Sequence, residues 1–275
     1  MEIKLIATDM DGTFLDDAKH APEENINALS ECAARGIHIV PATGRIINAI
    51  PDEIKNLPGV RYIIAVNGAV VADLETGKII STCKMRTDLA VKIMEMARDS
   101  ADDIMYDAYV GGMGRVDNRF YVNVEHYVQT PGVVGLVRKS RQPVPDSIAY
   151  VKECGEEVEK VNMLFVDMEA RARMRERLSH IPEVVVTSAI ANNLEINAAG
   201  ADKGGALLRL AEYLGISREE TMAFGDGEND LSMIKAAGMG VAMKNGEESV
   251  KTAADYVTVT NNEAGVAAAI RRFVL

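Results

Sequence analysis

The chain begins with an apolar, strand-like run at residues 3–8 that ends directly in the acidic sequence Asp9-Met10-Asp11-Gly12-Thr13. A short apolar run bounded by turn residues is typical of a strand that is buried on both faces of a parallel sheet. In open parallel sheets, ligands bind at the carboxyl ends of the strands. The opening residues therefore predict an α/β fold with a ligand site next to Asp9 and Asp11.

The two ends of the chain alternate between strand-like and helix-like patterns. The first third has strand-like runs at 37–42 and 62–66 and helix-like runs at 22–35 and 46–55. The last third has helix-like runs at 204–214 and 229–237, and strand-like runs at 221–224, 240–243 and 256–259. Short apolar strands separated by helices indicate βαβ units. We therefore expect a doubly wound, mostly parallel sheet.

The middle of the chain has a different pattern. A hairpin of 69–72 with 78–83 is followed by a helix-like run at 87–98, β-like runs at 104–110, 119–124 and 161–166, and a charged helix at 169–178. Residues 129–147 contain Pro, Gly and basic side chains and suggest irregular structure. We expect an α+β domain at 84–188, inserted into a core domain formed by 1–83 and 189–275.

A second acidic cluster, Gly225-Asp226-Gly227-Glu228-Asn229-Asp230, follows the strand-like run at 221–224. Carboxylates at the ends of two parallel strands can converge on one hard cation. Magnesium prefers oxygen ligands in near-octahedral geometry and keeps several waters, so Asp9, Asp226 and a phosphate oxygen would suit it. Gly12 indicates a turn that lets the chain bend around such a ligand. The sequence therefore predicts a site for Mg²⁺ and phosphate.

Two further segments add groups that suit a phosphate. Thr43 and Gly44 precede a helix-like run, where a hydroxyl and backbone N–H groups can bind phosphate oxygens. Lys203 stands at the start of another helix and would offset negative charge. Either residue alone has an ordinary explanation, as a helix cap or a solvated lysine. In this setting, one carboxylate could attack phosphorus and the other could transfer protons.

Composition excludes several classes of protein. The net charge of -11 argues against binding to the backbone of nucleic acids, and the three cysteines show neither disulfide nor metal-ligand spacing. No apolar run reaches the roughly 18 residues that a membrane span needs, and the N-terminus lacks the pattern of a signal peptide. We expect a cytoplasmic protein that does not associate with membranes. It would be a monomer or a small homo-oligomer.

The ordered motifs resemble those of the haloacid dehalogenase (HAD) superfamily, and specifically its Cof-type phosphatases with a large α+β cap, subclass IIB. Asp9-Met10-Asp11-Gly12-Thr13 resembles the first motif of that family, Thr43 the second, Lys203 the third and the segment 225–230 the fourth. The resemblance covers the whole chain, including the position of the inserted domain.

The resemblance implies a role for each matching residue. Asp9 would be the nucleophile and a Mg²⁺ ligand. Asp11 would be the general acid and base and would bind the metal through its backbone carbonyl. Thr43, Gly44, Lys203 and Asn229 would hold the phosphoryl group. Asp226 would bind Mg²⁺, and Asp230 would support or join the metal shell.

The predicted activity is Mg²⁺-dependent hydrolysis of a small phosphorylated metabolite through an aspartyl-phosphate intermediate. Sugar phosphates are the leading substrate class, ahead of phosphorylated cofactors such as pyridoxal phosphate or flavin mononucleotide; these classes come from the resemblance. The alternatives are a phosphomutase on the same fold and a non-enzymatic protein that binds sugar phosphates. Candidate residues for contacts with the substrate are Arg45, Asn67, Arg115, Arg119 and Arg141.

Overall fold

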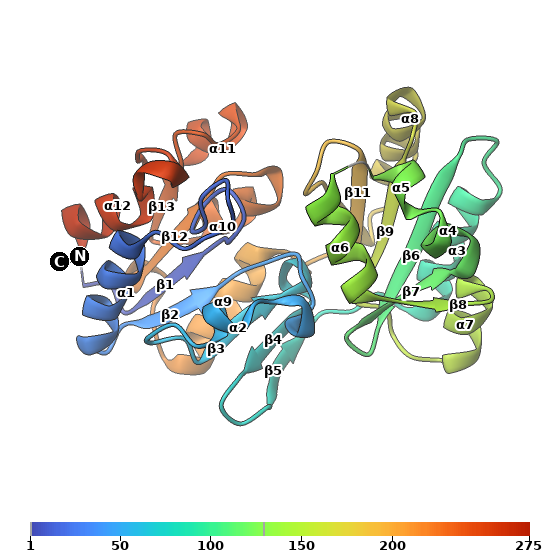
Figure 1. Cartoon of the computed structure of the whole chain (residues 1–275). Helices are drawn as coiled ribbons and strands as arrows, with labels where there is room; N and C mark the ends of the chain where they lie inside the picture. Colours follow the sequence, from blue (N-terminus) through green and yellow to red (C-terminus); the bar gives the residue numbers. More distant parts are fainter. Residues whose placement is uncertain (1, 129) are drawn as a thin grey trace. The chain divides into compact units, whose positions relative to one another are not determined.

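A five-stranded parallel sheet lies at the centre of the core (Figure 1). The computed structural model describes residues 2–128 and 130–275. The strand order is β14-β13-β12-β1-β2 and every pair is parallel. The strands are β1 (Leu5–Thr8), β2 (His38–Pro41), β12 (Thr221–Gly225), β13 (Met239–Ala242) and β14 (Tyr256–Val257). The predicted α/β class with a parallel sheet is thereby confirmed.

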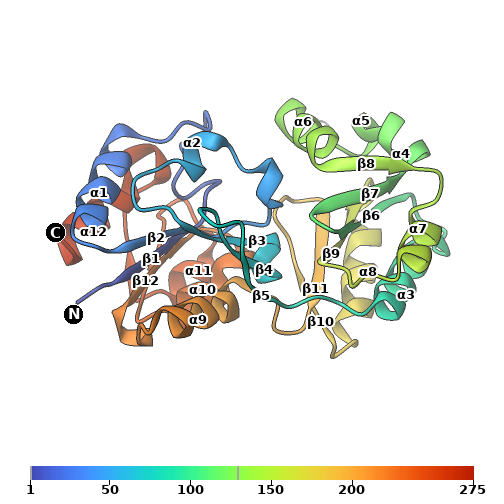
Figure 2. The same ribbon diagram turned by 90° about the horizontal axis from the view of Figure 1, so that it is seen from below.

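Helices cover both faces of this sheet (Figure 2). On one side, α1 (Glu23–Ala34) packs against α12 (Gly265–Phe273) and β2. On the other, α9 (Lys203–Leu214) packs against α10 (Leu231–Ala236), which in turn contacts α11 (Glu248–Ala253). Leu5 and Ala7 of β1 share a buried apolar cluster with residues of α9 and α10. Because side chains alternate along a strand, Ile6 points to the opposite face and is also fully buried.

A separate antiparallel sheet contains β3 (Tyr62–Ala65), β4 (Val70–Asp73) and β5 (Ile79–Thr82). The predicted hairpin of β4 and β5 is confirmed. The run at 62–66 was expected in the parallel sheet. Instead, β3 pairs antiparallel with β4, and isolated parallel bridges join Ile39 to Val60 and Ala42 to Ile64 between the segments of β2 and β3. The prediction of one helix at 46–55 is wrong, because this segment is not a single helix. It is divided into the 3-10 turn η1 (Ile47–Ala49) and α2 (Asp52–Lys55), because Pro51 lacks the N–H that a continuous helix requires.

The inserted region has its own six-stranded sheet, in the order β10-β11-β9-β6-β7-β8. The strands are β6 (Ile104–Val110), β7 (Met113–Asp117), β8 (Arg141–Val144), β9 (Lys160–Phe165), β10 (Val184–Thr187) and β11 (Asn193–Ala198). Its helices are α3 (Thr87–Arg98), α4 (Asn118–Val122), α5 (Val124–Tyr127), α6 (Pro131–Ser140), α7 (Ser147–Cys154) and α8 (Met168–Ser179). The predicted helices at 87–98 and 169–178 correspond to α3 and α8.

Two predictions in the inserted region are wrong. The β-like run at 119–124 forms α4 and the start of α5, and the buried residues Phe120, Val124 and Tyr127 follow a helical spacing. The segment expected to be irregular contains α6 and β8; Pro131 occupies the first turn of α6, where a proline is favourable. Gln129, at the start of that segment, lies outside the described residues.

Contacts divide the chain into two compact units. The core comprises the segment up to Gly44, Ile50–Thr82 and Asp202–Leu275, and the inserted unit comprises Arg45–Ala49 and Cys83–Ala201. The sequence placed the end of the insertion at 188. However, β11 pairs with β9 and therefore belongs to the inserted sheet.

Four further 3-10 turns lie in the core: η2 (Val66–Gly68), η3 (Arg218–Glu220), η4 (Glu228–Asp230) and η5 (Asn261–Glu263).

Candidate active site

The two acidic clusters meet at one edge of the parallel sheet. Asp9 follows β1, and its backbone N–H donates to the carbonyl of Phe224 in β12 at 3.0 Å. Asp226 follows β12 directly. Since β1 and β12 are parallel neighbours, their carboxyl ends bring the two aspartates together. Asp9, Asp226 and Asp230 each offer a carboxylate oxygen within 4.8 Å of the others.

A buried lysine bridges two of these carboxylates. Lys203 is the first residue of α9, and Asp202 caps this helix by accepting from the backbone N–H of Gly205. The Lys203 Nζ donates to Oδ1 of Asp9 and to Oδ1 of Asp230, both at 2.6 Å. The lysine side chain is fully buried. It engages only one of the two Asp9 carboxylate oxygens, which leaves the second for other chemistry.

Asp230 orders the loop that carries Asp226. Its Oδ2 accepts from the backbone N–H groups of Asp226 (2.9 Å) and Gly227 (3.0 Å), while its Oδ1 accepts from Lys203. Both oxygens are therefore used in holding the site together. Asp226 has a different partner, because its Oδ1 accepts from the Thr13 hydroxyl at 2.6 Å.

Burial and like charge shift the acidities in this cluster. Burial raises the pKa of Asp9 well above its ordinary value, and the carboxylates of Asp230 and Asp226 add to this against the opposing effect of Lys203. Burial, with Asp230 nearby, raises the pKa of Asp226 to about 6. Burial acts to lower the pKa of Lys203, but Asp230 and Asp9 outweigh it, so the net shift is upward. The site thus has an excess of negative charge, and this donor set of carboxylates fits a hard cation such as Mg²⁺.

The turn after β1 fits closely around Asp226. Gly12 has φ +85°, and a Cβ there would lie 2.5 Å from Oδ2 of Asp226. Asn245 donates through Nδ2 to the Gly12 carbonyl at 2.8 Å and so anchors the turn. The sequence reasoning gave no role to Thr13 or Asn245. The position of Thr13 inside the first acidic motif was a usable signal, whereas nothing near Asn245 in the sequence pointed to this contact.

Asp11 is not one of the three clustered carboxylates, but it is close enough for its charge to contribute to the raised pKa of Asp226. Its side chain pairs with Lys19 at 3.0 Å, and about a third of it is exposed (37%). A proton donor and acceptor needs exchange with solvent, so this partly exposed setting suits a general acid and base better than the buried setting of Asp9.

Thr43, Asn67 and Asn229 are connected by hydrogen bonds. The backbone carbonyl of Thr43 accepts from the N–H of Asn67 at 3.0 Å, and the Asn67 Oδ1 accepts from the Asn229 Nδ2 at 3.4 Å. Val66 and Asn67 have φ values of 53° and 55°. A positive φ is strained for a β-branched residue such as Val66, and such strain persists where the surroundings hold it. Gly44 follows Thr43, whereas Arg45 groups with the inserted unit.

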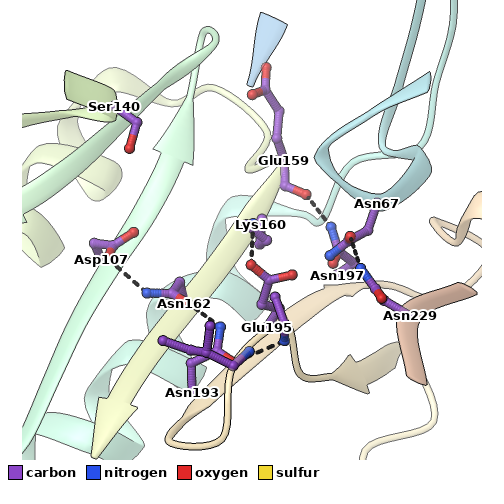
Figure 3. A network of polar contacts seen from close by, with 12 residues as sticks. Asn67, Asp107, Ser140, Glu159, Lys160, Asn162, Asn193, Glu195, Asn197 and Asn229 are labelled. Atoms are coloured by element: carbon purple, nitrogen blue, oxygen red, sulfur yellow. Dashed lines mark hydrogen bonds and ion pairs between the residues drawn. The ribbon is translucent and has the colours of Figure 1, made fainter. Parts of the chain in front are cut away.

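The three arginine candidates of the inserted unit lie in different surroundings. Arg115 stacks on Tyr150 of α7, with its Cζ 4.8 Å from the ring centroid, and hydrogen-bonds Gln142. Arg119 pairs with Asp117 at 3.3 Å and is largely exposed. Arg141 is buried and pairs with Asp107 at 3.3 Å. The same Oδ2 atom of Asp107 that Arg141 contacts also accepts from Nδ2 of Asn162, at 3.1 Å (Figure 3).

The parallel sheet, with three converging carboxylates and a bridging lysine at its carboxyl edge, defines the class as an α/β protein with an anionic site that could hold a cation. The sequence profile of the haloacid dehalogenase-like hydrolase family matches residues 6–270. The chain belongs to this family, as the motifs predicted.

Relatives named as phosphatases match nearly the full length of the chain, and the chain is a phosphatase. The chain is 32% identical to the Bacillus subtilis 5-amino-6-(5-phospho-D-ribitylamino)uracil phosphatase YcsE, covering 100% of this chain and 97% of that protein. It is 33% identical to the B. subtilis phosphatase YwpJ, over 96% and 98% of the two chains. Among solved structures, the subclass IIB sugar phosphatase BT4131 has a TM-score of 0.80 at 27% identity, over 98% of both chains.

The raised pKa of Asp226 predicts a measurable effect on stability. Its value is about 6 when folded and about 4 when unfolded, so between these pH values the folded state binds more protons and stability falls as pH rises. Without divalent cations, Asp226→Asn should therefore increase the free energy of unfolding at pH 7 by about 1–3 kcal/mol. The gain should vanish near pH 3, where both states are largely protonated. Urea denaturation at the two pH values measures this, and an equal gain at both would contradict it.

Proposed function

We propose that the protein is a Mg²⁺-dependent phosphohydrolase that cleaves small phosphomonoesters, with sugar phosphates as the leading class, through an aspartyl-phosphate on Asp9. The observation that carries the proposal is the lysine-bridged cluster of Asp9, Asp226 and Asp230 at the sheet edge. A binding protein would not need a buried carboxylate held with one oxygen free beside a second, solvent-accessible acid.

The chain's own residues support a two-step reaction. In the first step, the free oxygen of Asp9 attacks phosphorus, the bond from phosphorus to the ester oxygen breaks, and Asp11 protonates the leaving alcohol. In the second, Asp11 takes a proton from water, the water oxygen attacks phosphorus, and Asp9 is released with inorganic phosphate. Lys203 offsets the negative charge on Asp9 and on the phosphoryl oxygens in both steps.

The residues that would hold Mg²⁺ are Asp9 and Asp226, with Asp230 supporting the shell through the loop that it orders. The family resemblance adds the backbone carbonyl of Asp11. When bound, the cation would neutralise charge on the phosphoryl group as a Lewis acid. Thr43, Gly44 and Asn229 are proposed to contact phosphoryl oxygens, with Arg45 and Asn67 as weaker candidates.

The substrate class draws on the relatives. The names of YcsE and BT4131 specify a ribitylamino-uracil phosphate and sugar phosphates, and a 26% identical Escherichia coli relative is a pyridoxal phosphate phosphatase, YbhA. All three act on small phosphorylated molecules. We propose that the inserted unit selects among such substrates, because the acidic motifs lie outside it.

A phosphate-release screen over a panel of phosphomonoesters with Mg²⁺ tests the proposal. Release that needs no bisphosphate activator would separate hydrolysis from the phosphomutase alternative. Absence of release from every member, including p-nitrophenyl phosphate, would favour the non-enzymatic alternative.

Among the residues that the structure describes, no helix has the length and apolarity to cross a membrane. The cytoplasmic location and the oligomeric state stay predictions.

Removal of divalent cations should reduce phosphate release by at least about 100-fold, because three carboxylates within 4.8 Å repel one another and the substrate. Mg²⁺ should restore the rate after treatment with EDTA. Ca²⁺ should not, since its larger and more flexible shell permits bidentate binding that would occupy the attacking oxygen of Asp9. Full activity in EDTA would count against the proposed metal dependence.

A further inference from the structure

The loop after β1 folds back on itself. The backbone N–H of Leu15 donates to the carbonyl of Met10 at 2.9 Å, and the N–H of Asp16 donates to the carbonyl of His20, also at 2.9 Å. These two turns bring Lys19 alongside Asp11, and the Lys19 Nζ lies 3.0 Å from Oδ1 of Asp11. The loop therefore places a cation against the residue that is proposed as the general acid and base.

The turn that carries Lys19 has a constrained backbone. Lys19 has φ 67°, a conformation that residues other than glycine rarely adopt. Its N–H donates to the carbonyl of Asp16 at 3.0 Å, and the N–H of His20 donates to Oδ1 of Asp16 at 2.8 Å. The Asp17 N–H donates to Oδ1 of Asn262 at 3.0 Å, which ties the turn to η5. Backbone strain of this kind persists where the surroundings hold it, and it is frequent at functional sites.

The stability of the fold does not account for this arrangement. The side chains of Lys19 and Asp11 are 58% and 37% exposed. An ion pair with this exposure contributes little to stability, because water screens the attraction and two side chains lose freedom. The contact does, however, fix the orientation of the Asp11 carboxyl group. The strained turn is therefore better explained by the effect of Lys19 on Asp11.

The chemistry of the ammonium group determines what this contact can do. A lysine side chain has three N–H donors and no acceptor. The oxygen of Asp11 that faces it, Oδ1, can accept from Lys19 both when Asp11 is ionised and when it is protonated. A proton on Asp11 is then carried by the other oxygen, Oδ2. Lys19 thus selects the oxygen from which Asp11 donates a proton.

We propose that Lys19 is a positioning residue, which holds the Asp11 carboxyl group so that Oδ2 carries the proton for the leaving group. The inference rests on the proposed phosphatase function. In the first step, the Oδ2–H bond breaks, the ester oxygen takes the proton, and the bond from phosphorus to that oxygen breaks. The carboxylate that remains on Asp11 is stabilised by the ammonium of Lys19, since the contact now joins opposite charges. Lys19 itself neither gains nor loses a proton.

Three phosphomonoesters test this role, namely benzyl, phenyl and p-nitrophenyl phosphate. Their leaving groups are similar in shape and carry no further hydroxyl group, but they differ in acidity. p-Nitrophenol is the most acidic and leaves with the least need for a proton, whereas benzyl alcohol is the least acidic and needs one most. The value of kcat/KM covers the steps up to release of the alcohol, so hydrolysis of the aspartyl-phosphate does not enter it.

Lys19→Asn removes the ammonium and suits the backbone, because Asn tolerates a positive φ. It should lower kcat/KM by about 10- to 100-fold for benzyl phosphate and by less than about 3-fold for p-nitrophenyl phosphate, with phenyl phosphate between them. Lys19→Arg keeps a cation that only donates, and it should stay within about 3-fold of the wild type for all three esters.

The matched control is Lys55→Asn. Lys55 also forms an exposed ion pair in the core, with Asp52 at 2.7 Å, but neither residue belongs to the proposed site. This control should keep all three esters within about 3-fold of the wild type. Thermal denaturation shows whether each variant folds. If Lys19→Asn does not fold, Lys19→Gly takes its place, because glycine adopts a positive φ without strain.

The outcomes separate the positioning role from the phosphatase function. An equal loss for the three esters in Lys19→Asn, or no loss, would overturn the inference while the phosphatase function stands. If the wild type releases no phosphate from these esters or from any sugar phosphate, the proposed function itself fails. If it accepts only sugar phosphates, Lys19→Asn should lower kcat for the best of them by about 10-fold with KM within about 3-fold. A change in KM alone would then overturn the inference.

Discussion

Replacing Asp9 with Asn is expected to reduce phosphate release by about 10⁴-fold or more while the protein stays folded. The amide is a poor nucleophile, yet it retains an oxygen that can accept from Lys203 as Oδ1 of Asp9 does now at 2.6 Å. The fold should therefore survive, because burial favours the neutral side chain at this position. Steady-state phosphate release and a denaturation curve measure the two effects.

Asp17→Asn is the matched control for that experiment. Asp17 lies on the same loop, but its carboxylate accepts from Asn261 and Asn262 rather than joining the acidic cluster. It should keep activity within about 3-fold, as is usual for substitutions away from a site. Rapid quenching with radiolabelled substrate should label the wild type and the control but not Asp9→Asn. Label on the Asp9 variant would show that another residue is the nucleophile.

The second large effect is expected for Lys203→Met. This change removes the buried cation that bridges Asp9 and Asp230 and leaves their carboxylates uncompensated. Breaking a buried pair by removing one partner costs about 3–5 kcal/mol, and we expect a loss of that size in the free energy of unfolding. Phosphate release should also fall by about 10²- to 10³-fold, because the charge on the nucleophile and phosphoryl group is no longer offset.

Urea denaturation with and without Mg²⁺ tests the origin of this loss. Mg²⁺ should recover more stability in Lys203→Met than in the wild type, since a ligand that binds only the folded state stabilises it. The control is Lys4→Met, which breaks an ion pair with Glu220 at the surface and should cost little. A Lys203→Met protein as stable and active as the wild type would show that the bridge is unimportant.

The local patterns of the sequence were sufficient for the parallel sheet and for the position of the acidic motifs. Buried strands of a parallel sheet are continuous apolar runs, so residues 3–8 and 221–224 were recognisable without neighbours. The meeting of Asp9 and Asp226 followed from the rule for strand ends. In contrast, the strand predicted at 119–124 was wrong. The aromatic and β-branched residues of this segment favour strands, but Phe120, Val124 and Tyr127 are buried at a helical spacing, and the segment forms helices.

By itself, the sequence determined the family, the parallel core and the positions of the acidic motifs, because each of these depends on short runs of neighbouring residues. Only the tertiary structure decided that Lys203 bridges Asp9 and Asp230 and that Asp107 is left with an unpaired oxygen. Asp107, Lys160 and Glu195 come from three strands, and each would suit an exposed strand face equally well. Their burial depends on sheet register and on packing between distant segments, and neither is encoded in the local spacing of residues.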